Sequence, residues 1–458
     1  MTTPLFRAAK QFRPALALLG LGLLGLASCQ SNIDAPPAPS AGPLDFSSYV
    51  AVGNSLTSGY SDGGLYNEAQ ATSYPALLAQ QFATTGKGPA SFVQPAFSAA
   101  RKDGSGYAKL QLVNGALTPV VPSAANSFLG EQVAYTGGTL VGSGQPQLEA
   151  YSGAQPDNLG VPGISVLSSL NALTNNLAPY GIINPFYERL LTAAEKPTKD
   201  YVTYIGQKSP TFFTCWMGNN DVLTYASNGG VVSAANPFSN LTDTTRFGIG
   251  YRAILQTISK NGTVKGAVAN IPNVTAVPFF TTVTVGAIVA TYQAAGLPIT
   301  SIYIQALTST GTTTTRAATS ADLLTLTARA YLAANPGRGA SPTSPIPTDY
   351  VLDTQEQANV VARTVQLNAI IAKTAARFKV PVVDANTFLT QIGPGIASNA
   401  VNNTATYASG NLFSLDGVHP TPRGYAIVAN EWIRVINNYY GATIPQVAPN
   451  DYRAVPFP

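Results

Sequence analysis

The residue that most constrains the chemistry of this chain is His419, because it is the only histidine among 458 residues. A reaction that needs an imidazole near neutral pH has no other ring to use. Asp416 stands three residues earlier, in Asp416-Gly417-Val418-His419-Pro420-Thr421. At this spacing its carboxylate can hydrogen-bond a ring nitrogen, fix the tautomer and stabilise the imidazolium that forms when the ring accepts a proton. The pair therefore has the residue types of a general base and its orienting acid.

A serine follows the first strand-like run of the chain. Tyr49–Val52 is a short, partly β-branched run, and it breaks into Gly53-Asn54-Ser55-Leu56-Thr57. A serine on such a turn lies at the carboxyl edge of a parallel sheet, where the nucleophiles of α/β enzymes are found. Ser55 is therefore the preferred candidate for the nucleophile.

A second serine matches a known nucleophile motif. Ser61 lies in Gly59-Tyr60-Ser61-Asp62-Gly63, which fits the pattern Gly-x-Ser-x-Gly. That motif requires a strand directly before the serine and a helix directly after it. Ser61 instead follows a polar turn and precedes Gly64-Leu65-Tyr66. We expect this segment to line the mouth of the site, while Ser61 in place of Ser55 stays open as the alternative.

Two further polar blocks lie between Ser55 and His419. Asn158-Leu159-Gly160-Val161-Pro162-Gly163 reads as a tight turn, and Gly218-Asn219-Asn220-Asp221 interrupts the apolar, strand-like run Thr211–Met217. Polar residues at the end of a strand lie at the edge of the sheet where ligands bind. Both blocks are therefore candidate parts of one site.

The four blocks, in this order, resemble those of the SGNH/GDSL hydrolase family, and they span nearly the whole of residues 46–440. The resemblance implies that Ser55 is the nucleophile and that its own backbone N–H is the first oxyanion donor. It implies two more donors, the backbone N–H of Gly163 and the side chain of Asn220, with Gly160 as the competing glycine. It also implies His419 as the base and Asp416 as its orienter. One departure is Asn54, where the family usually has Asp, which removes a charge beside the nucleophile.

Around these blocks the sequence predicts strands that alternate with helices, which is typical of an α/β fold with a mainly parallel sheet. The resemblance makes this a three-layer α/β/α sandwich of flavodoxin-like type. We expect insertions at about residues 97–157, with strands of their own, and 274–345, which begins with the uncharged run Val274–Tyr292. Pro278 and five threonines argue against a membrane span there. Further predicted strands are Val264–Ile271 and Val380–Val383, and predicted helices are Tyr74–Phe82, Ile164–Leu173, Arg246–Ser259, Leu323–Ala334, Thr354–Phe378 and Gly424–Tyr440.

The N-terminus predicts export and lipid anchoring. A basic start and the apolar run Ala15–Leu26 precede Leu26-Ala27-Ser28-Cys29, which resembles a bacterial lipobox. We therefore expect a signal peptide over residues 1–28, lipidation of Cys29, a Pro-rich tether over 29–45, the hydrolase domain over 46–440 and a C-terminal tail over 441–458. An ordinary secretory signal is the alternative. Gln30 after the cysteine favours the outer membrane of the cell envelope.

Composition limits the partners. Only 10% of residues are charged, and three of the 25 basic residues lie in the leader, so residues 29–458 carry 22 basic and 21 acidic side chains. This balance gives no reason to propose nucleic acid as a partner. After lipidation of Cys29, Cys215 is the only thiol, in an apolar run typical of a buried structural cysteine. No Cys/His cluster predicts a zinc site, so we expect no metal and no organic cofactor.

These features together predict a serine esterase that forms an acyl-enzyme and needs only its own side chains. The run Val274–Tyr292 is either part of an acyl-binding groove, which favours lipid esters, or part of the core. The 97–157 elaboration, with scattered Tyr and Gln, instead suits a glycan ester. A catalytically weak or inactive surface binding lipoprotein on the same fold is the alternative function. The sequence gives no indication of the oligomeric state.

Overall fold

A computed structural model describes residues 37–113, 115–120, 148–171, 184–192, 194–196, 198–234, 237–308 and 311–458. The predicted signal peptide and residues 29–36 of the predicted tether, which include Cys29, lie outside the described residues, as do 121–147 of the first predicted insertion. The chain divides into two units, Met1–Ala38 and Pro39–Pro458, and the fold belongs to the second.

The centre of this unit is a parallel sheet. Among the described residues it has four strands in the order β1 (Tyr49–Gly53), β4 (Phe212–Trp216), β5 (Lys265–Ala269) and β10 (Val382–Val383). In register, Ala51 pairs with Thr214, and Thr214 pairs with Ala267. Every residue of β1 and β4 is buried, as expected for parallel strands covered on both faces.

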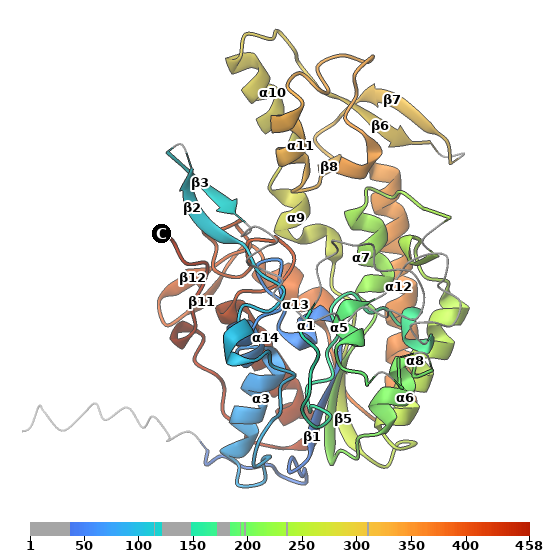
Figure 1. Cartoon of the computed structure of the whole chain (residues 1–458), viewed down its shortest axis with the longest axis vertical. Coiled ribbons are helices and arrows are strands. Elements are labelled where there is room, and N and C mark those ends of the chain that lie inside the picture. Colours follow the sequence, from blue (N-terminus) through green and yellow to red (C-terminus); the bar gives the residue numbers. More distant parts are fainter. Residues whose placement is uncertain are drawn as a thin grey trace, which may run out of the picture. The chain divides into compact units, whose positions relative to one another are not determined.

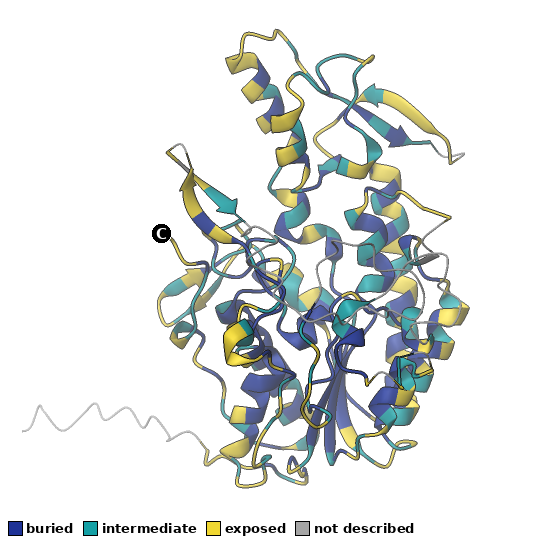
Figure 2. Ribbon diagram, viewed as in Figure 1, coloured by how far each residue is buried: buried dark blue, intermediate teal, exposed yellow. Residues whose placement is uncertain are grey.

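Helices cover both faces of the sheet, because alternate side chains of each strand point to opposite sides. Val50 and Val52 pack into a core with α6 (Tyr201–Gly206), α8 (Thr244–Ile258) and α12 (Thr354–Arg377). Tyr49 and Ala51 pack into a second core with α3 (Tyr74–Ala83) and α14 (Pro422–Tyr440). The two layers are visible in Figure 1, and Figure 2 shows the buried strands between them. The predicted α/β/α fold is confirmed, as are the predicted helices at α3, α8, α12 and α14, whereas α6 was not predicted.

The edge of the sheet beside β1 is extended by the segment that carries the second polar block. The N–H of Ala51 donates to the carbonyl of Asp157 at 2.9 Å, and the N–H of Leu159 donates to the carbonyl of Ala51 at 2.8 Å. The N–H of Val161 then donates to the carbonyl of Gly53 at 3.0 Å. These bonds carry the turn Asn158–Gly163 to the end of the sheet where β1 stops.

Shorter elements surround this end of the sheet. They are α1 (Ser55–Ser58), α2 (Asn67–Ala71), α5 (Pro185–Glu188), α7 (Asn220–Ser227), α13 (Ala385–Ile392), and the strand pairs β2 (Lys109–Val113) with β3 (Ala116–Val120) and β11 (Ile396–Ser398) with β12 (Val401–Asn403). The antiparallel pair β2 and β3 confirms that the segment predicted as an insertion at about residues 97–157 carries strands of its own.

Residues 274–352 form a body with its own small core beyond the end of the sheet (Figure 1). It contains η4 (Val274–Ala276), α9 (Pro278–Thr281), α10 (Val285–Ala294), β6 (Tyr303–Leu307), β7 (Thr313–Ala317), β8 (Leu323–Leu324), α11 (Ala328–Ala334) and β9 (Val351–Leu352). The uncharged run Val274–Tyr292 is thus broken into three short helices. Among the described residues, no helix has both the length and the apolar character needed to cross a membrane.

Two predicted helices are wrong in part. Ile164–Leu173 is mostly turn, with a single 3-10 turn at Ser168–Leu170, and its last two residues lie outside the described ones. The reason is that the buried carboxylate of Asp221 accepts the N–H groups of Val166 and Leu167, at 2.8 and 3.3 Å. These N–H groups therefore bond a distant side chain and not backbone carbonyls of their own segment. The helix predicted for Leu323–Ala334 begins only at Ala328, because Leu323 and Leu324 pair with β9.

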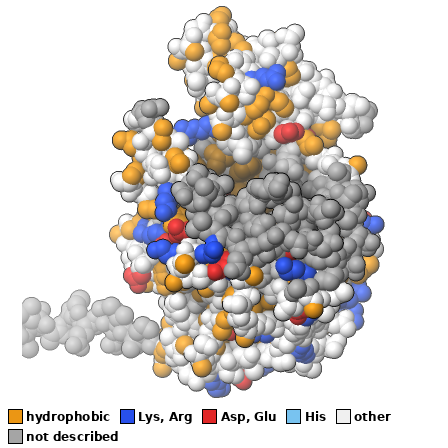
Figure 3. All heavy atoms as spheres, viewed as in Figure 1, with side chains coloured by type: hydrophobic (Ala, Val, Ile, Leu, Met, Phe, Trp, Pro, Cys, Tyr) orange, Lys and Arg blue, Asp and Glu red, His pale blue; other side chains and the backbone are white. Residues whose placement is uncertain are grey.

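The coloured part of the face in Figure 3 is mostly white and orange, with scattered blue and red side chains. This agrees with the low content of charged residues, 10% of the chain.

Candidate active site

Ser55 lies where β1 meets α1. Asn54 is the N-cap of α1, and its side-chain oxygen accepts the N–H of Leu56 at 3.1 Å. This cap ends the strand and starts the helix within one residue, so Ser55 becomes the first helical residue at the carboxyl end of the sheet. Asn54 keeps this role although the family usually has Asp there. The side chain of Ser55 is nearly buried, with 7% of its surface exposed.

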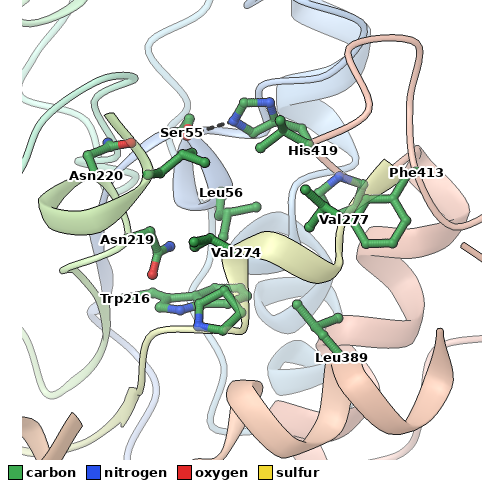
Figure 4. A pocket seen from close by; sticks show the side chains of 14 residues that line it. Ser55, Leu56, Trp216, Asn219, Asn220, Val274, Val277, Leu389, Phe413 and His419 are labelled. Atoms are coloured by element: carbon green, nitrogen blue, oxygen red, sulfur yellow. Dashed lines mark hydrogen bonds between the residues drawn. The ribbon is translucent and has the colours of Figure 1, made fainter. Parts of the chain in front are cut away.

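Ser55, His419 and Asp416 form one hydrogen-bonded chain. The Oγ of Ser55 lies 2.8 Å from Nε2 of His419, as the dashed line in Figure 4 marks. The Nδ1 of His419 lies 2.9 Å from Oδ2 of Asp416. With the ring proton on Nδ1, Nε2 is free to accept the proton of the serine hydroxyl. The structure therefore brings together the three residues that the sequence predicted to act together, although 361 residues separate Ser55 from Asp416 in the chain.

The carboxylate of Asp416 is held by its own loop. Its Oδ1 accepts the backbone N–H groups of Val418 and His419, both at 2.8 Å, and its Oδ2 also accepts the N–H of Gly63 at 2.9 Å. Burial alone would raise the pKa of Asp416, but attraction to His419 and these hydrogen bonds outweigh it, so the pKa lies below its usual value. Asp416 therefore stays ionised and can stabilise an imidazolium.

The segment Gly59–Gly63 supports the histidine loop. The ring of Tyr60 lies against the imidazole of His419, with 4.7 Å between the centroids. Burial, and next the charge of Asp416, raise the pKa of Tyr60, so the phenol stays neutral. Its hydroxyl donates to the carbonyl of Gly63 at 2.6 Å. This contact was not predicted from the sequence, although Tyr60 lies in the motif that drew attention to Ser61.

Ser61 is buried beside the loop, and its hydroxyl bonds the backbone there. Its Oγ donates to the carbonyl of Pro420 at 3.1 Å, and only 1% of the residue is exposed. The next residue, Asp62, accepts the N–H of Leu415 at 3.0 Å, while its own N–H donates to Oγ of Ser414 at 2.8 Å. The segment therefore fastens the histidine loop and does not form the mouth of the pocket described below.

The two candidate glycines of the second block differ in their surroundings. Gly160 packs against α1 so closely that an added Cβ would lie 2.4 Å from the backbone nitrogen of Ser58. Gly163 has a φ of +78°, which favours glycine, and an added Cβ would meet only Nδ2 of Asn184, at an ordinary contact distance of 3.6 Å. Among the described residues, the N–H groups of Ser55 and Gly163 donate to no protein acceptor. Both are therefore available to an oxyanion.

Asn220 is the first residue of α7. Its side-chain amide donates to the carbonyl of Ile164 at 2.8 Å, which fixes its orientation and leaves its second N–H for another acceptor. Asp221, which follows it, is buried and binds the neighbouring turn through Val166 and Leu167. Burial raises the pKa of Asp221 to about 6, against the opposing effect of those hydrogen bonds. Asn220 and Asp221 thus hold the start of α7 against the turn that directly follows Gly163.

A pocket opens beside this constellation. It encloses about 510 Å³ that no atom occupies, part of it open to solvent. Its four polar lining residues are Ser55, Asn219, Asn220 and His419. The remaining lining residues are apolar: Leu56, Trp216, Leu223, Pro272, Val274, Val277, Leu389, Phe413, Val418 and Pro420. Figure 4 shows Leu56, Val274 and Trp216 below Ser55, with Val277 and Phe413 farther along.

The run Val274–Tyr292 contributes residues both to this pocket and to a separate core. Its first residues, Val274 and Val277, line the pocket, whereas Val285, Ile288 and Tyr292 are buried in the core of the 274–352 body. Trp216, Leu389 and Phe413 had not been predicted as lining residues. The position of Trp216 at the end of β4, just before Gly218, was the signal that could have found it.

Comparison with known proteins agrees with this geometry. The family model described as GDSL-like Lipase/Acylhydrolase matches residues 49–432, from β1 into α14. A comparison with curated proteins found no match. Among the described residues, no group of three or more His, Cys, Asp or Glu is arranged to hold a metal ion. The matched range covers most of the chain and supports a hydrolase that acts on esters. The chain therefore belongs to the GDSL-like lipase/acylhydrolase family.

Proposed function

We propose that this protein is a secreted, lipid-anchored serine esterase in which Ser55 is the nucleophile. The observation that carries the proposal is the hydrogen-bonded chain from Ser55 through His419 to Asp416, opening on an apolar pocket. His419 takes the proton of Ser55 as the hydroxyl attacks the ester carbonyl, and Asp416 stabilises the imidazolium. The imidazolium then returns the proton to the leaving alcohol, which leaves an acyl-enzyme.

Water completes the cycle. His419 removes a proton from a water molecule, the resulting hydroxide attacks the acyl-enzyme, and Ser55 regains its proton from the imidazolium. In both steps the negative charge develops on the former carbonyl oxygen. We assign its three donors to the N–H of Ser55, the N–H of Gly163 and the side-chain amide of Asn220. Removing one such donor typically costs about 10²–10³ in rate.

The pocket supports a substrate with an apolar acyl group. Ten of its lining side chains are apolar, so an acyl chain of several carbons loses contact with water on binding, which is worth about 0.8 kcal/mol per methylene. We therefore favour lipid or medium-chain esters over glycan acetyl esters.

A series of p-nitrophenyl esters from acetyl to hexadecanoyl tests this function. We expect the highest kcat/KM for chains longer than acetyl, and no activity in Ser55→Ala. Leu223→Trp, at a partly exposed position of the pocket wall, should move the optimum to shorter chains. Val361→Trp is the matched control, because Val361 is 50% exposed on α12 and does not line the pocket.

Two results would argue against the proposal. An acetyl optimum unchanged in Leu223→Trp would remove the apolar pocket from substrate binding. No hydrolysis of any ester by folded wild-type protein would favour the binding lipoprotein instead.

The lipid anchor rests on Leu26-Ala27-Ser28-Cys29, and outer-membrane sorting rests on Gln30. We expect the wild-type protein, made in a Gram-negative host, to take up radiolabelled palmitate and to sediment with outer-membrane fragments. Cys29→Ala should lose the label, whereas Cys215→Ala should keep it, because Cys215 is buried in β4. A labelled Cys29→Ala protein would contradict the anchor.

A further inference from the structure

The pocket contains one polar side chain that neither the triad nor the oxyanion donors use. Asn219 lies at the N-cap position of α7, and only 4% of it is exposed. Among the described residues, neither Nδ2 nor Oδ1 of this side chain has a hydrogen-bond partner. Figure 4 shows the amide on the pocket wall, between Asn220 and Trp216 and facing Leu56 and Val274.

Asparagine at an N-cap ordinarily bonds the first N–H groups of its helix. Asn219 has helical backbone angles, φ −60° and ψ −44°, and makes no side-chain cap. The adjacent Asn220 uses its amide to hold Ile164. The side chain of Asn219 therefore bonds neither the helix end nor the neighbouring turn.

An unpaired buried amide is costly, typically about 1–3 kcal/mol for each group left without a partner. An apolar side chain of similar size at this position would avoid the cost and match the wall formed by Leu56, Trp216 and Val274. A bound molecule with a polar atom next to Asn219 would supply the missing hydrogen bond and so remove this free-energy cost while the pocket is occupied.

We propose that Asn219 binds a hydroxyl on the acyl group of the substrate, so that the enzyme prefers hydroxyacyl esters. This inference rests on the proposed function and adds the substrate class. A hydroxyl is the smallest group that can donate to Oδ1 and accept from Nδ2. A charged substituent does not fit, because the described residues that line the pocket include no Lys, Arg, Asp or Glu to pair with it.

The test uses matched esters with one alcohol: hexanoate, 2-hydroxyhexanoate and 3-hydroxyhexanoate. For wild type we expect kcat/KM to be at least about tenfold higher for one hydroxy ester than for hexanoate, because a site built to hydrogen-bond a hydroxyl discriminates against the analogue without it. In Asn219→Leu the ratio of kcat/KM for that hydroxy ester to kcat/KM for hexanoate should fall to about one or below. Asn219→Ala repeats the measurement if the leucine variant does not fold.

Labelling with an unsubstituted alkyl fluorophosphonate serves as the control. Asn219→Leu should still be labelled on Ser55, which separates substrate recognition from loss of the triad. The inference is overturned if kcat/KM of wild type for hexanoate equals or exceeds its kcat/KM for both hydroxy esters. It is also overturned if Asn219→Leu keeps the wild-type preference for the hydroxy ester. Failure of the proposed function itself is recognised by the absence of both labelling and hydrolysis of any ester.

Discussion

Replacing Asp416 with Asn changes the hydrogen bonds of the site at one point. The oxygen of the new amide can still accept the N–H groups of Val418 and His419, as Oδ1 does now at 2.8 Å. The new NH₂ group, however, takes the place of Oδ2. That oxygen now accepts from Gly63 and from Nδ1 of His419, each at 2.9 Å.

The consequence for His419 is a change of tautomer. An NH₂ group facing Nδ1 favours the ring form with the proton on Nε2, and that form cannot accept the proton of Ser55. The imidazolium also loses its counter-charge. For a Ser-His-Asp triad this substitution lowers kcat by about 10⁴, and we expect about 10³–10⁴, or about 4–5 kcal/mol of activation free energy. KM should change little, because Asp416 does not line the pocket.

The assay is steady-state hydrolysis of the best p-nitrophenyl ester, with thermal unfolding to verify that the variant folds. Asp243→Asn is the control: Asp243 caps α8 through the N–H groups of Thr245 and Arg246, and Asn caps equally well. It should leave kcat unchanged. A kcat for Asp416→Asn within tenfold of wild type would refute the tautomer argument.

Three further changes test other parts of the structure. Gly160→Ala places a Cβ 2.4 Å from the backbone nitrogen of Ser58 and should lower the free energy of unfolding by about 1–3 kcal/mol, as measured by urea titration. The control Gly286→Ala, where an added Cβ has nothing within 4 Å, should not lower it. Asp62→Asn weakens the hydrogen bond that the N–H of Leu415 donates, at 3.0 Å, and should lower kcat about tenfold with KM unchanged, because Asp62 positions the loop of His419. A change in KM alone would contradict this positioning role. Burial raises the pKa of Glu356 from 4.5 to about 8 in the folded chain. The unfolded chain therefore loses this proton first as the pH rises, and stability falls between about pH 4.5 and 8, by at most about 5 kcal/mol. Glu356→Gln should remove that slope in urea titrations at several pH values, and an unchanged slope would show that another group titrates.

The parts of the fold that the sequence predicted well are those whose burial pattern is local. The strands β1, β4 and β5 are apolar runs, and α12 carries its apolar stripe over 24 residues after the capping box of Asp353 and Glu356. Ser55 and Asn220 were predictable because each follows a strand that ends in a polar turn. His419 could be identified as the candidate base without the structure, because the chain contains no other histidine.

The parts that were missed depend on contacts between distant segments. The turn after Ile164 is not helical because Asp221, 57 residues later, binds its backbone. Leu323 looked helical but pairs with Leu352. The pocket wall is assembled from Trp216, Leu389 and Phe413, which share no sequence pattern. Asn219 differs from Asn220 only in where its side chain points.

The most direct test of the account is to identify the atom that reacts. Purified mature protein is treated with a fluorophosphonate, and the adduct is located by peptide mass spectrometry in wild type, Ser55→Ala and Ser61→Ala. We expect one adduct per molecule, on Ser55, in wild type and in Ser61→Ala, and none in Ser55→Ala. An adduct on Ser61, or on any other residue of wild type, would contradict Ser55 as the nucleophile.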